Sequence, residues 1–109
     1  MYQKRRYVSV VDTEMAKESG IKIMNAYPNP TSGLISLNIE NYTPEGINKG
    51  VAQIEVLDLV GRVIQLSQQN LDEGYNILSL DMSNLSSGLY LVRVKDSNQH
   101  EAVVRVSKM

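Results

Sequence analysis

Apolar and polar residues alternate with a period of two over most of this chain, and this pattern constrains the fold more than any other feature. Between residues 34 and 40, Ile35, Leu37 and Ile39 alternate with Ser36, Asn38 and Glu40. Successive side chains of a β-strand point to opposite faces. Such a run therefore predicts a strand with one face toward a core and one toward water.

Similar short runs follow along the chain. They lie at residues 52–57, 63–67, 75–80, 88–95 and 101–107. In the run at residues 75–80, either face could point inward, because both carry apolar side chains. A further strand is expected to begin at Ile21, so the chain contains six or seven short strands.

Turn-forming residues separate these runs. Pro28 and Pro30 lack a backbone N–H and cannot lie inside a strand. Gly61 suits a tight hairpin that needs a positive φ angle. A second short turn is expected at residues 96–98, and a longer, looser loop at residues 41–50. Frequent turns between short alternating strands favour an antiparallel sandwich.

We therefore predict an all-β fold, an immunoglobulin-like antiparallel β-sandwich of about seven strands, at residues 21–109. Tyr90 opens a strand just after Gly88, where a tyrosine corner sits in such sandwiches. The alternative is that Tyr90 is simply a large core residue. Residues 1–20 are predicted to form a linker or N-terminal arm, with a candidate strand at residues 7–11 and a short candidate helix at residues 13–19.

Composition excludes several kinds of site. The 109 residues include no cysteine and one histidine, His100. Thiolate or multi-histidine metal sites are thereby excluded, and a histidine-based triad has one candidate. The net charge of −1 and the absence of Trp and Phe argue against a nucleic-acid partner. No apolar run has the length of a membrane span, so no membrane insertion is expected.

Catalytic chemistry finds little support in the sequence. His100 lies in a predicted turn with no neighbouring nucleophile, where a solvated side chain is the expected role. Asp58 and Asp81 lie at strand ends, where bonds to backbone amides in the turns are expected. We therefore expect no catalytic, cofactor-binding or metal-binding residues and no enzyme activity; a calcium site built from separate loops is the weaker alternative.

Four segments, taken in order, resemble one known family. The first is a Pro-Asn-Pro-x-x-Gly box formed by Pro28, Asn29, Pro30 and Gly33. The second is an Asp-x-x-Gly-Arg hairpin with Asp58, Gly61 and Arg62, and the third is a Leu-x-x-Gly-x-Tyr strand with Gly88 and Tyr90. The fourth is a closing apolar strand with a basic end, formed by Val104, Arg105, Val106 and Lys108. Together these segments resemble the type A C-terminal sorting domain of cargo proteins of the type IX secretion system of Bacteroidetes.

The resemblance implies a non-catalytic address label at the end of a longer exported protein. Its implied partners are a preceding cargo domain, the type IX translocon and a sortase-like cysteine peptidase, and it implies no cofactor. The cargo crosses the periplasm and the outer membrane, the peptidase removes the label, and the cargo is secreted or stays at the cell surface. Cleavage is expected within residues 1–22, whose polar stretch at 13–20 suits protease access.

The motif residues are expected to act first in folding. The Pro-Asn-Pro box would stiffen the chain before its sharp return at Gly33, Gly61 would close the central hairpin, and Gly88 and Tyr90 would lock the crossover. The signal itself is expected at the last strand, residues 102–106. As a sheet edge with Lys108 beyond it, this strand would offer a receptor backbone groups and a charge.

The N-terminal sequence leaves a second function open. Lys4, Arg5 and Arg6 precede an apolar run too short for the core of an export signal. The chain is thus expected to be either a piece of a longer exported protein or a stand-alone module. The alternative function is a cell-surface interaction module, adhesive or glycan-contacting, which would use Tyr42 in the loop at residues 41–50. An enzyme would rest on His100 and scattered carboxylates alone.

Overall fold

The structure, a computed structural model, describes residues 20–42 and 50–109. The candidate strand at residues 7–11, the candidate helix at 13–19 and residues 43–49 of the loop expected at 41–50 lie outside the described residues. Tyr42, expected in that loop, is the last residue of a strand. Seven strands are described: β2 (Gly20–Tyr27), β3 (Leu34–Tyr42), β4 (Gly50–Leu57), β5 (Val63–Leu71), β6 (Gly74–Asp81), β7 (Gly88–Lys95) and β8 (Glu101–Lys108). The predicted all-β class is confirmed.

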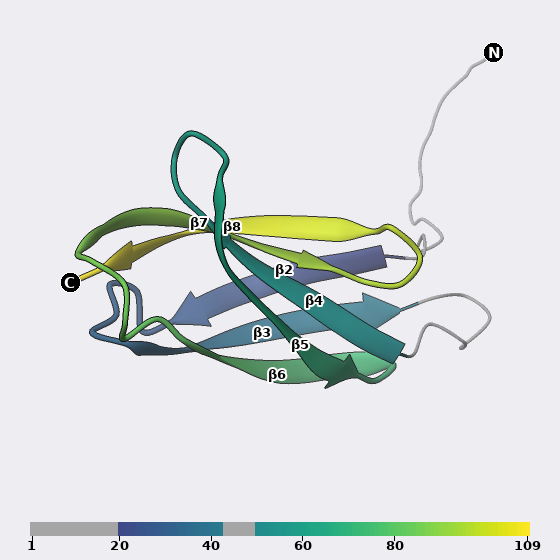
Figure 1. Cartoon of the computed structure of the whole chain (residues 1–109). Helices are drawn as coiled ribbons and strands as arrows, with labels where there is room; N and C mark the ends of the chain where they lie inside the picture. The colour runs from purple at the N-terminus through teal and green to yellow at the C-terminus, as the bar shows by residue number, and fades with distance from the viewer. Residues whose placement is uncertain (1–19, 43–49) are drawn as a thin grey trace, which may run out of the picture.

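The strands form two sheets, seen as two layers in Figure 1. One sheet has the order β2-β3-β6 and the other the order β5-β4-β7-β8. Every pair of neighbouring strands within a sheet is antiparallel. This arrangement is the predicted β-sandwich. Among the described residues there is no helix, and hence none long and apolar enough to span a membrane.

The core lies between the sheets and is built from the alternating positions that the sequence predicts. Ile35, Leu37 and Ile39 point inward from one sheet, and they face Ile54 and Val92 of the other. The remaining buried members of the cluster are Ala52, Val56, Leu71, Leu78, Leu80, Met82, Tyr90, Val94 and Val106. Burial of this aliphatic surface is the main force that holds the two layers together.

The structure settles the face of β6 that the sequence left open. Leu78 and Leu80 are buried, whereas Tyr75 and Ile77 are largely exposed on the outer face. The register explains this choice, because Leu78 and Leu80 pair with the inward residues Leu37 and Ile35 of β3.

β5 extends to Leu71, four residues beyond its predicted end. The inward positions of β5 include the polar residues Gln65 and Gln69. The sequence of this strand therefore does not alternate between apolar and polar residues. The Gln65 side-chain amide donates to the Asp81 carbonyl at 2.9 Å. The Gln69 amide donates to the Ser79 carbonyl and accepts from the Ser79 N–H. These glutamines cover the exposed backbone edge of β6 and join the two sheets along one side.

Candidate functional site

The four sequence motifs gather at one end of the sandwich. Because strand direction alternates along the chain, every second connection lies at the same end. The connections after β2, β4 and β6 and the end of β8 therefore lie together, as Figure 1 shows on the side where the chain ends. We call this the motif end. The start of β2 and the β7–β8 turn lie at the opposite end.

The Pro-Asn-Pro box binds the last strand. The Asn29 side-chain amide donates to the Arg105 carbonyl, and its oxygen accepts from the Ser107 N–H, both at 3.0 Å. The Thr31 N–H donates to the Ser107 carbonyl at 2.9 Å, and the Met109 N–H donates to the Thr31 carbonyl at 2.8 Å. Asn29 and Thr31, which we call the latch, thus act as a short parallel strand beside β8.

The turn after the latch explains the glycine of the first motif. The buried Thr31 hydroxyl donates to the Leu34 carbonyl at 2.7 Å and accepts from the Gly33 N–H at 3.0 Å. The Gly33 carbonyl accepts from the Met82 N–H. A Cβ on Gly33 would lie 3.0 Å from the Ser83 Cβ, so the close approach of two backbones, rather than an unusual φ angle, requires glycine here. Both X-Pro bonds of the box are cis.

The last strand was expected to be a free sheet edge, with the charge of Lys108 beyond its end, and the structure differs from this expectation. β8 extends through Lys108, which is only 9% exposed, and the Lys108 ammonium donates to the Met109 carbonyl. Val106 is fully buried and Val104 half-buried, while Arg105 is exposed. The latch occupies the outer edge from Arg105 onward, because Asn29 and Thr31 supply the backbone partners that an edge strand lacks. This pairing could not be predicted from the sequence, because it joins residues that are 76 and 78 positions apart.

The Asp-x-x-Gly-Arg motif is a self-contained hairpin turn. The Gly61 N–H donates to the Asp58 carbonyl, and Gly61 has a φ of 93°. The Asp58 carboxylate accepts from the N–H groups of Val60 and Arg62, and the Arg62 Nε lies 2.7 Å from its second oxygen. The backbone bond from Arg62, joined by its side chain, lowers the pKa of Asp58 despite partial desolvation. The predicted bonds of Asp58 to turn amides are confirmed, as are those of Asp81 to Ser83.

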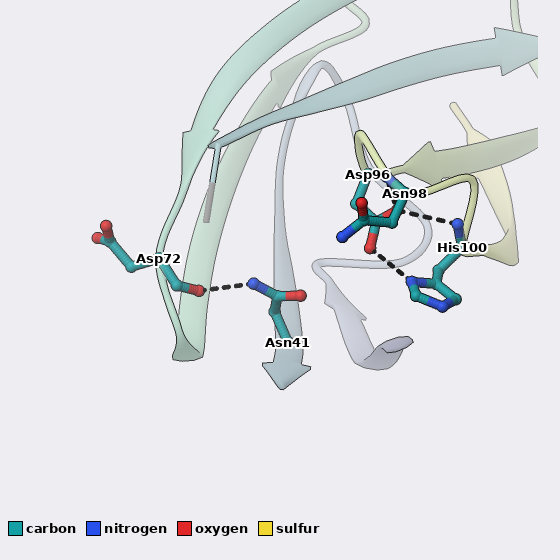
Figure 2. A network of polar contacts seen from close by, with 5 residues as sticks. All are labelled: Asn41, Asp72, Asp96, Asn98 and His100. Atoms are coloured by element: carbon teal, nitrogen blue, oxygen red, sulfur yellow. Dashed lines mark hydrogen bonds and ion pairs between the residues drawn. The ribbon is translucent and has the colours of Figure 1, made fainter. Parts of the chain in front are cut away.

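The turn that contains His100 repeats this architecture. The Gln99 N–H donates to the Asp96 carbonyl, and Gln99 has a φ of 72°. The Asp96 carboxylate accepts from the N–H groups of Asn98 and His100, and the His100 Nδ1 lies 2.9 Å from its second oxygen (Figure 2). His100 thus stands where Arg62 stands in the other turn. Unlike the solvated side chain expected from the sequence, it is half-buried and paired, and it closes a hairpin.

The two turns predict opposite effects for two glycine substitutions. Gly61→Ala is expected to destabilise the fold by about 1–2 kcal/mol, because alanine disfavours the left-handed region. Gln99→Gly is expected to stabilise it by up to about 1 kcal/mol by removing the same strain. Urea unfolding measures both. Gly20→Ala is the control, because a Cβ there meets nothing within 4 Å and the φ is ordinary; equal losses at Gly61 and Gly20 would contradict the account.

Tyr90 forms the predicted tyrosine corner. Its hydroxyl donates to the Ser86 carbonyl at 2.5 Å, four residues upstream, while its ring is 8% exposed in the core cluster. A Cβ on Gly88 would meet nothing within 4 Å, so no close approach requires glycine here. Its φ of 154° is the reason for glycine at this position.

A buried carboxylate lies on the outer face of the larger sheet. Glu55 on β4 is 6% exposed, with the Arg93 Nε at 2.6 Å and the Lys95 Nζ at 3.9 Å. Burial raises the pKa of Glu55, but the hydrogen bonds from Arg93 and Gln53 and the two positive charges lower it further, so its pKa lies below the ordinary value. Glu55 and Arg93 therefore form a structural ion pair.

Glu55 predicts how stability changes with pH. Its lowered pKa means that the unfolded chain binds more protons, so its stabilising effect is present above about pH 4.5 and is lost as pH falls through the folded-state pKa. Thermal unfolding between pH 7 and pH 2.5 should show a falling Tm below this value. Glu55→Gln should flatten that fall, with Glu73→Gln as an exposed control. An unchanged profile in Glu55→Gln would contradict this role.

The opposite end of the sandwich contains a polar hollow of about 320 Å³. It is lined by Val51, Gln53, Gln68, Lys95, Asp96, Ser97 and Gln99. His100 does not line it, and the Asp96 carboxylate is already occupied in the turn. Within residues 20–42 and 50–109, no group of three or more His, Asp or Glu side chains is placed to hold a metal ion. Nearby, the Asn41 amide donates to the Asp72 carbonyl and ties β3 to the β5–β6 turn (Figure 2).

Comparison with solved structures supports the fold alone. Part of a β-glucosidase from Kluyveromyces marxianus is similar, with a TM-score of 0.53 and 16% sequence identity. The match covers 83% of this chain but 14% of that one. The chain therefore spans a small fraction of the enzyme's length. A search of curated proteins gives no match.

A family model supplies the identification. The family is described as "Secretion system C-terminal sorting domain", and its model matches residues 25–107. The match contains the first three motifs in full and all but the end of the fourth. The chain belongs to the family of C-terminal sorting domains of the type IX secretion system.

Proposed function

We propose that this chain is a non-catalytic sorting signal that directs an attached cargo protein through the outer membrane and is then cleaved from it. Membership of the family implies export to the cell surface or beyond and interaction with the type IX secretion machinery. The observation that carries the finer proposal is the gathering of all four motifs at one end, away from the end at which β2 begins.

In this proposal, residues 21–109 are the signal and residues 1–20 are the linker to the cargo, with cleavage within residues 1–22. A cargo that precedes the linker would be joined to the sandwich at the end where β2 begins, and not at the motif end. The motif residues Pro28, Asn29, Gly33, Asp58 and Gly61 would act by shaping that end. So would Pro30, Arg62, Gly88 and Tyr90. In the last strand, Arg105 is exposed and would contact the receptor, whereas Val104, Val106 and Lys108 would hold this strand in the sandwich.

The test is a periplasmic reporter with the whole 109-residue chain at its C-terminus, expressed in a host with type IX secretion. We expect the reporter at the cell surface or in the medium, and in the periplasm when the chain is omitted or the translocon is deleted. A reporter that stays in the periplasm with the chain attached would contradict the proposal.

The polar hollow favours a second candidate function, a glycan-contacting surface module. Its amide, hydroxyl and ammonium groups could donate to and accept from sugar hydroxyls. A glycan array tests this: signals lost in Gln68→Ala and Ser97→Ala would support sugar binding at the hollow. An array without signals would leave sorting as the sole candidate.

A further inference from the structure

An apolar surface lies on the outer face of the larger sheet at the motif end. The register aligns Val63, Leu57 and Leu91 in one row across β5, β4 and β7. Leu89 lies two residues before Leu91 on the same face of β7, and the β4–β5 turn adds Leu59 and Val60. We call Leu57, Leu59, Val60, Val63, Leu89 and Leu91 the motif-end patch.

The patch is exposed where a partner could contact it. The exposed fractions are 79% for Val60, 60% for Leu59, 48% for Val63 and 44% for Leu89. Leu57, in the same row as Val63, is 5% exposed. Single exposed apolar residues are ordinary on a protein surface, but neighbouring ones on a rigid hairpin and sheet are typical of interaction sites.

One unpaired arginine and one ion pair border the patch. Arg105 continues the row next to Leu91 on β8, and its side chain is exposed. Arg62 lies at the other border, in the β4–β5 turn, with its side chain 79% exposed. The Asp58 carboxylate nearby is already occupied by two turn amides and Arg62. Among the described residues, no carboxylate lies within ion-pair distance of Arg105.

Resting on the proposed function, we propose that the motif-end patch is the docking surface for an outer-membrane protein of the secretion machinery, whose facing surface is apolar and bordered by carboxylates. Charge complementarity selects such a partner, because the exposed Arg105 attracts and aligns an acidic surface. A second copy fits worse. In a two-fold dimer through this patch, Arg105 would face the Arg62–Asp58 pair of the other copy, which has no net charge. One unpaired arginine also gives only weak attraction to an anionic lipid surface.

The latch joins this surface to the first motif. Asn29 holds the backbone of Arg105 and Ser107, so it fixes the strand that carries the arginine at the patch border. The segments of the second and third motifs thus supply the patch, the fourth motif supplies Arg105 at its border, and the first motif holds the strand that carries this arginine.

The test uses the reporter with the full chain at its C-terminus and two patch variants, Val60→Glu and Arg105→Glu. Both side chains are exposed, so folding should be preserved, and thermal unfolding of the purified chains verifies this. The matched control is Ile77→Glu on the outer face of the smaller sheet, where Ile77 is 73% exposed. We expect each patch variant to reduce the exported reporter by at least about tenfold, and the control to be exported like the wild type.

The outcomes separate this proposal from the one on which it rests. If the wild-type fusion is exported and the patch variants are exported equally well, the docking surface is wrong and the sorting function stands. If the wild-type fusion is not exported, both fail. Sedimentation of the purified chain tests a second copy: a dimer that Val60→Glu dissociates would overturn the proposal. Binding to vesicles of anionic phospholipid that Arg105→Glu abolishes would overturn it in favour of a membrane.

Discussion

Replacing Tyr90 with alanine should destabilise the domain by about 3–5 kcal/mol, which exceeds half the stability of many domains of this size. The ring fills core space beside Val92 and Val106, and its loss leaves a cavity. The hydroxyl also holds the β6–β7 crossover through the Ser86 carbonyl. Urea unfolding followed by circular dichroism measures the free-energy change.

The conservative variant Tyr90→Phe separates these two contributions. It keeps the ring and should cost about 1–2 kcal/mol, the value of one buried hydrogen bond. Tyr75→Phe is the matched control, because Tyr75 is 78% exposed, and it should change stability by less than about 0.5 kcal/mol. If Tyr90→Phe were as stable as the wild type, the corner bond would have no structural role.

Replacing Asn29 with alanine should release the outer edge of the last strand. Two side-chain bonds to β8 are lost, which should cost about 1–3 kcal/mol of unfolding free energy. Local opening at the outer edge of the last strand should be affected more than global unfolding. The Ser107 N–H, which loses its acceptor, should exchange with solvent at least about tenfold faster, as measured by hydrogen exchange.

Two internal comparisons test the latch. The Val106 N–H points toward β7, because successive residues of a strand face alternate edges, and its protection should fall less than that of Ser107. Asn70→Ala removes an exposed amide from β5 and should leave both amides unchanged. Equal exchange at Ser107 in Asn29→Ala and wild type would show that the latch does not hold β8.

Much of this fold could be predicted because its signals are local. The alternation around Leu37 fixes which face of β3 is buried, and Gly61 fixes a turn through its own φ angle. Tyr90 after Gly88 predicted a hydrogen bond only four residues away. Each of these depends on neighbours in the sequence, so residue type and spacing are sufficient to predict it.

The remaining features depend on pairing between distant segments. Nothing near Asn29 indicates that its amide will meet Arg105 and Ser107, and for that reason β8 was expected to have a free edge. Gln69 likewise covers β6 through a contact that apolar periodicity cannot indicate. The gathering of the motifs at one end could have been predicted, because strictly alternating strands place every second connection together. His100 was predicted to lie in a turn, but its pairing with Asp96 was not predicted, because a solvated side chain was expected there.

Removal of the sandwich during export can be tested by the intact mass and C-terminal sequence of the exported reporter to which the whole chain has been fused. We expect a reporter at the cell surface or in the medium that ends within residues 1–22 of this chain and lacks the sandwich. A reporter that stays in the periplasm with all 109 residues attached would contradict it.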